Sequence, residues 1–102
     1  MAKDWKNLRE MISYSEGGIL SKVIVSGAKV ANVTLFCMAK GTELTEHTST
    51  REGVVYVIEG SGTFTLEGED IPMLPGTFIH MKKKAAHSLR ADENTSFVLV
   101  LY

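Results

Sequence analysis

The stretch GVVYVIEGSGTFTLEGEDIPMLPGTFIHM, residues 53–81, decides the fold of this 102-residue chain. It contains short runs rich in valine, isoleucine, threonine and aromatic residues, which are typical of β-strands. Glycine, proline or acidic residues separate these runs at 59–62, 67–70 and 75–76, where we expect turns. Many short strands with closely spaced turns predict a sandwich or a barrel, because both architectures let each strand bury one face.

Two more strands are expected earlier in the chain. Residues 19–25 and 30–37 are rich in β-branched and aromatic side chains, and Gly27 lies between them. No segment repeats with a period of roughly 20–50 residues, which argues against solenoids and propellers. The chain after its first residues is therefore predicted to be an all-β meander.

The first residues predict a short helix. Asp4 is a plausible N-cap, and Trp5, Leu8, Met11 and Ile12 recur at helical spacing. We expect this face to be packing surface.

Length and composition predict one domain and exclude one class of partner. With 102 residues and 44% hydrophobic content, the chain suits a single compact core. Its 11 basic and 12 acidic residues leave no broad basic surface, so we expect no nucleic-acid partner.

The sequence also suggests a compartment. No apolar run approaches the roughly 20 residues needed to cross a bilayer, and the first residues lack a signal-peptide pattern, so no membrane partner is expected. Cys37 is the one cysteine and has no partner for an internal disulfide. We expect a soluble cytoplasmic protein.

Three histidines are the candidate functional residues. His47, His80 and His87 stand in or near the predicted strands. If the chain is extended around His47, Ser49 points the same way, and Glu52 can lie near them across the following bend. Histidine and carboxylate together can bind iron, manganese, nickel or zinc. The alternative is that these histidines are surface or hydrogen-bonded core residues.

Other chemistries lack their signatures. No serine stands in a GxSxG elbow, and Cys37 has no histidine nearby in the sequence to activate it. No glycine-rich phosphate loop is present either. Catalytic residues therefore stay unassigned.

Two segments carry a resemblance to a known family. Residues 41–49, GTELTEHTS, followed by YVIEG at 56–60, resemble the first motif of the cupin superfamily. Residues 75–81, PGTFIHM, followed by His87, resemble the second. The resemblance covers about residues 30–102 and implies an antiparallel, jelly-roll-like β-barrel of the RmlC-like kind. Residues 1–29 would add the helix and first strand to this single domain, residues 1–102.

The resemblance also implies a site. Cupins bind metal through two histidines and an acid of the first motif and one histidine of the second, and His47 and His87 match two of these. Ser49 replaces the second histidine, and Gly53 takes the place of the acid, with Glu52 displaced by one residue. We expect His47 and His87 as ligands, Glu52 and His80 as additional candidates, and Ser49 and Tyr56 as pocket-lining residues.

The expected function is that of a small-molecule-binding cupin whose barrel holds a divalent metal. If it is an enzyme, the resemblance implies an oxygenase, isomerase or lyase. The alternative is a degenerate, metal-free cupin that acts as a binding or regulatory module. A homodimer is expected in either case, since the apolar residues 97–102 can pair or pack across a dimer.

Overall fold

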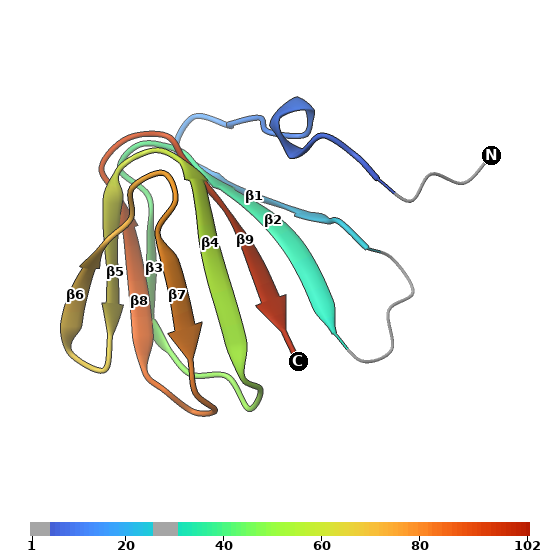
Figure 1. Ribbon diagram of the computed structural model, residues 1–102. Helices are drawn as coiled ribbons and strands as arrows, with labels where there is room; N and C mark the ends of the chain where they lie inside the picture. The colour runs from blue at the N-terminus through green and yellow to red at the C-terminus, as the bar shows by residue number, and fades with distance from the viewer. Residues whose placement is uncertain (1–4, 26–30) are drawn as a thin grey trace.

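The computed structural model describes residues 5–25 and 31–102 of the chain. Within them the chain forms one 3-10 turn and nine strands, drawn in Figure 1. In chain order these are η1 (Leu8–Glu10), β1 (Ile19–Val23), β2 (Asn32–Met38), β3 (Glu43–His47), β4 (Gly53–Glu59), β5 (Gly62–Leu66), β6 (Glu69–Pro72), β7 (Phe78–Met81), β8 (His87–Ala91) and β9 (Thr95–Leu101).

The strands form two antiparallel sheets. One has five strands in the order β1-β2-β9-β4-β7, and the other has four in the order β3-β8-β5-β6. Figure 1 shows the four-stranded sheet facing the β4, β7 and β9 part of the larger one. The predicted all-β, antiparallel barrel is confirmed.

The predicted N-terminal helix is wrong except for a single turn. The 3-10 turn at Leu8–Glu10 starts after Asn7, whose side chain accepts a hydrogen bond from the Arg9 N–H at 3.0 Å. A short isolated helix is marginally stable in water, and here Trp5 is 73% exposed rather than packed. The expected cap Asp4 lies outside the described residues.

The two predicted early strands are both present with shifted ends. The first ends at Val23 rather than residue 25, and the second runs from Asn32 to Met38. Gly27 and Val30, which we expected at the turn and the second strand's start, lie outside the described residues. No helix in the described part of the chain is long and apolar enough to span a membrane.

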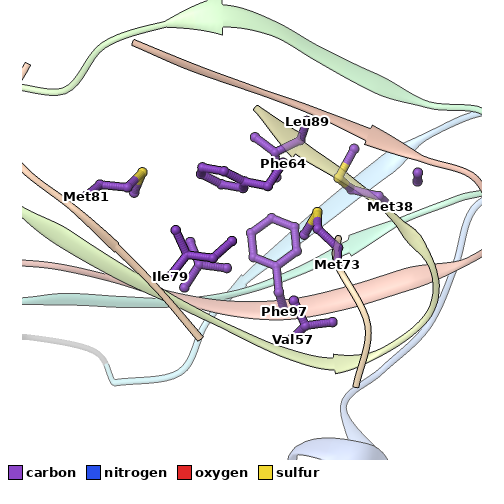
Figure 2. Packing of buried hydrophobic residues seen from close by; sticks show 10 residues of the cluster. Met38, Val57, Phe64, Met73, Ile79, Met81, Leu89 and Phe97 are labelled. Carbon is purple, nitrogen blue, oxygen red and sulfur yellow. The ribbon is translucent and has the colours of Figure 1, made fainter. Parts of the chain in front are cut away.

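The core lies between the two sheets. Alternate strand residues point inward, so the buried cluster draws on both sheets, as Figure 2 shows. Burying one large apolar side chain contributes roughly 1.5–3 kcal/mol. The cluster comprises Met38, Val55, Val57, Phe64, Met73, Ile79, Met81, Leu89, Ala91 and Phe97.

The segment before β1 packs against the outer face of the five-stranded sheet. The Tyr14 hydroxyl donates to the Glu59 carboxylate at 2.7 Å, and Lys22 on β1 donates to the Met11 carbonyl and the Ser13 hydroxyl. One part of this sheet's outer face is thereby covered.

Candidate functional site

Strands β3 and β8 bring His47 and His87 together. The two residues are register partners, and their ring centroids lie 4.1 Å apart in an edge-to-face arrangement. They come from the first and second of the resembling motifs, which are distant in sequence. The predicted pair of histidines therefore shares one place in the barrel.

A bulge in β3 turns His47 inward. Leu44 pairs with Leu89 and His47 with His87, so three steps along β3 oppose two along β8. In a regular strand, residues three apart point to opposite faces, but the bulge lets Leu44 and His47 share the inner one. Both of these side chains line the same half-open cavity.

Each histidine has one ring nitrogen held by the backbone. Nδ1 of His47 lies 2.7 Å from the Thr45 carbonyl, and Nδ1 of His87 lies 3.0 Å from the Ala85 carbonyl. A carbonyl only accepts, so Nδ1 carries the hydrogen in both rings. In the neutral form, Nε2 of both residues is then an unprotonated acceptor.

His87 is the more enclosed of the two. It is only 7% exposed, and the Phe64 ring stacks on it with centroids 5.6 Å apart. Burial lowers the pKa of His87, and the nearby His47 lowers it further, while the hydrogen bond to Ala85 opposes them. The arrangement favours neutral imidazole, which is the form that binds metals.

The two histidines line a half-open cavity of about 50 Å³, in which His87 is buried and His47 is exposed. The other lining side chains are all apolar and come from both sheets. They are Phe36, Leu44, Val55, Phe64, Met81, Leu89, Phe97 and Leu99. The cavity thus presents imidazole as its one kind of polar side chain.

Glu52 and His80 lie together, away from this cavity. Nε2 of His80 contacts the Glu52 carboxylate, which also accepts from the Tyr102 hydroxyl at 3.3 Å. Ile79 and Met81 point into the core, so His80 between them faces outward. The His80 hydrogen bond is the largest effect on the pKa of Glu52 and lowers it.

Ser49 and Tyr56 also lie outside the cavity lining. The Ser49 hydroxyl accepts from the Arg51 N–H at 3.1 Å, and its carbonyl accepts from the Lys84 N–H at 2.7 Å. Tyr56 is 49% exposed, because its neighbours Val55 and Val57 take the inward positions.

The apolar cavity wall is what sequence reasoning missed. Phe64 stands between Thr63 and Thr65, and this alternation of apolar and polar residues was an available signal for an inward ring. Which inward rings meet the histidines depends on how the sheets face each other.

The donor set at the histidine pair is small. Across residues 5–25 and 31–102, no group of three or more histidine, cysteine, aspartate or glutamate side chains is placed to hold one metal ion. The chain's own contribution at this place is the two imidazoles.

Comparison with solved structures shows the same fold in other proteins. An RmlC-like cupin from Desulfovibrio desulfuricans is 21% identical, with a TM-score of 0.84 over 98% of this chain and 96% of that one. A Cupin 2 conserved barrel domain protein from Leptotrichia buccalis is 28% identical, with a TM-score of 0.86 over 94% of this chain and 46% of that one. A salicylate 1,2-dioxygenase from Pseudaminobacter salicylatoxidans is 20% identical, with a TM-score of 0.75 over 82% of this chain and 26% of that one.

Comparison with curated proteins finds no match. The family model described as "Cupin domain" matches residues 34–102, which include both histidines of the pair and every strand from β3 onward. On that match, this chain belongs to the cupin family.

Proposed function

We propose that this cupin binds a small molecule in its barrel and that His47 and His87 hold a divalent metal beside it. The observation that carries the proposal is the backbone hydrogen bond at each Nδ1, which leaves both Nε2 atoms as acceptors. Histidine ligands of metals commonly donate their other ring N–H in this way.

The spacing of the two rings fits a shared ion. Metal–nitrogen distances near 2.0–2.1 Å put the centroids of two rings on one ion within roughly 6 Å of each other. The rings of His47 and His87 meet this limit, with centroids 4.1 Å apart. Two neutral imidazoles suit iron, manganese, nickel or zinc.

Each part of the site would have its own task. A bound metal with open positions supplies Lewis-acid or oxygen-activating chemistry. The carbonyls of Thr45 and Ala85 orient the two rings, and the stacked Phe64 ring shields His87 from water. The likeness to a salicylate dioxygenase supports oxygenase among the candidate activities, with isomerase and lyase as the others.

Metal content tests this function. Protein purified without a histidine tag is expected to contain nearly one equivalent of iron, manganese, nickel or zinc by elemental analysis, or to take one up. His47→Ala and His87→Ala should each lose it, because one imidazole alone holds an ion weakly. His80→Ala is the matched control and should keep the metal, since His80 faces outward with Glu52.

A second candidate is a metal-free binding or regulatory module. Two contacts favour it: Glu52 bonds His80, and the Ser49 hydroxyl accepts from the Arg51 N–H. Neither residue then adds a ligand to His47 and His87. In that case no uptake of the four metals would be measured, while small molecules would still raise the melting temperature by binding the native state.

We further propose that the protein works in a reducing compartment, the cytoplasm. Cys37 is buried as a free thiol, and no other cysteine exists to pair with it. Fractionation of cells that produce the protein from its own gene tests this, and recovery from the medium would contradict it.

A further inference from the structure

A third kind of donor atom lies at the histidine pair. The Met81 side chain lines the same cavity as His47 and His87. Among the described residues that line this cavity, Met81 is the one besides the histidines whose side chain carries a nitrogen, oxygen or sulfur atom. Thioether sulfur is a soft, polarisable donor that binds soft metal ions. Beyond histidine, cysteine and carboxylate, the chain therefore brings a methionine to this place.

The fold puts these three residues at one end of the barrel. His47 is the last residue of β3, Met81 is the last of β7, and His87 is the first of β8. The turn between β7 and β8 is tied to the segment after His47, because the Lys84 N–H donates to the Ser49 carbonyl at 2.7 Å. Met81 thus approaches from the five-stranded sheet, while both histidines belong to the four-stranded one.

The sulfur end of Met81 lies inside the barrel. Met81 is 3% exposed and belongs to the buried cluster. Figure 2 shows its sulfur turned toward Phe64, the ring that stacks on His87. Its register partner Gly53 has no side chain to compete for this space, and a Cβ atom there would lie 3.4 Å from the Met81 Cε. The thioether therefore fills the inner side of β4 and β7 beside the ring that covers His87.

From this donor set we propose that Met81 is a third metal ligand and that the site prefers copper. Cu(II) is the divalent ion that sites of nitrogen, oxygen and sulfur donors hold most tightly, and a thioether adds affinity for Cu(I). All three donors are uncharged, which suits a singly charged ion in a partly buried site. The inference rests on the proposed function for its two imidazole ligands; it adds copper to the candidate metals and places it first.

Affinities for Cu(I) and Zn²⁺ test the third ligand. Each ion is titrated into metal-free protein without oxygen, in competition with a chromogenic chelator. Met81→Leu should lower the Cu(I) affinity by about tenfold or more and the Zn²⁺ affinity by less than about twofold, because leucine keeps the volume and removes the sulfur. Met73→Leu is the matched control and should leave both affinities unchanged, since Met73 is buried in the core outside the cavity lining.

The methionine methyl groups give a second readout on the wild-type protein. Cu(I) is diamagnetic, so NMR signals of isotope-labelled methionine methyl groups stay sharp when the ion is added. One equivalent of Cu(I) should shift the Met81 signal, which is assigned by its absence in Met81→Leu. The signals of Met38 and Met73, which belong to the same buried cluster but do not line the cavity, should move far less.

An unchanged Cu(I) affinity in Met81→Leu would overturn the third ligand, as would a Met81 methyl signal that Cu(I) does not move. If His47→Ala and His87→Ala still lose Zn²⁺ in that case, the proposed function stands. Cu(I) binding that depends on Met81 and on neither histidine would instead overturn the proposed pair of ligands. No uptake of either ion by the wild-type protein would overturn both proposals.

Discussion

At the scale of single residues, Gly60 shows how closely two turns approach each other. Its φ is +115°, in the region that favours glycine. A Cβ atom there would lie 2.5 Å from the Thr95 Cα and 2.6 Å from the Asn94 carbonyl oxygen. Both contacts involve backbone, so the chain itself would have to move.

Gly60→Ala is expected to lower the free energy of unfolding by roughly 2–5 kcal/mol, from backbone strain plus steric overlap. Gly68→Ala is the matched control, because Gly68 has a φ of +81° and nothing within 4 Å of the new atom. Only the strain, about 1–2 kcal/mol, should appear there. Urea denaturation compares the two, and equal losses would contradict the proposed contact.

His87 makes the stability depend on pH. Burial lowers the pKa of His87 in the folded protein below its ordinary value of 6.5. As the pH falls below 6.5, the unfolded chain therefore binds a proton at His87 before the native state does. Stability is therefore unaffected above that value and is lost as the pH falls below it.

We expect chelator-treated wild-type protein to lose more stability between pH 7.5 and pH 5 than His87→Gln, which has no proton to bind. Urea midpoints at both pH values measure the difference, and the other titrating groups are common to both proteins. Parallel loss in the two proteins would show that His87 does not titrate in this way.

At the scale of elements, the strands were predictable and the first helix was not. Period-two patterns and turn residues locate strands because they are local properties of the chain. The spacing of Trp5, Leu8, Met11 and Ile12 suggested a helix, yet the segment makes one 3-10 turn and follows the sheet. There it bonds Lys22 of β1 and, through Tyr14, Glu59, which is 45 residues further along the chain, and helical spacing predicts neither contact.

Tyr14 reports on this N-terminal segment. Burial raises its pKa to about 12, and the hydrogen bond to Glu59 adds to the rise. The native state keeps the phenol proton after the unfolded chain has lost it near pH 10. The stability that Tyr14 contributes is therefore full below pH 10 and lost as the pH rises toward 12.

Tyr14→Phe should reduce the loss of stability between pH 10 and pH 12, and it should reduce the phenolate absorbance that appears near pH 12. Thermal unfolding at several alkaline pH values and ultraviolet titration measure these effects. An unchanged titration curve would mean that another tyrosine accounts for the late absorbance.

At the scale of the whole molecule, residues 5–25 and 31–102 leave one apolar face exposed. Tyr56 and Phe78 are register partners on β4 and β7, 49% and 62% exposed, and Val98 lies beside Tyr56 on β9. The Glu52–His80 pair borders this face, since His80 pairs with Val54 in the same ladder. An apolar patch with a polar border is the usual arrangement of a surface that binds a second copy.

We therefore propose that this face joins two copies of the chain. Light scattering at micromolar concentration should give the mass of a dimer for the wild-type protein and of a monomer for Phe78→Glu, which buries a charge in the interface. Ser88→Glu, on the outer face of the other sheet, is the control and should stay dimeric. A monomeric wild-type protein would exclude the interface.

The sequence by itself determined the all-β fold, because alternation and turn residues are local properties, and it named His47 and His87 through the resemblance of two segments to the cupin motifs. Only the tertiary structure decided which candidates meet: it joined His47 to His87 and paired Glu52 with His80 on the outside. The physical reason is that a shift of one residue reverses the face of every following side chain in a strand. The bulge between Leu44 and His47 makes that reversal, and it arises from pairing with β8, 40 or more residues later in the chain.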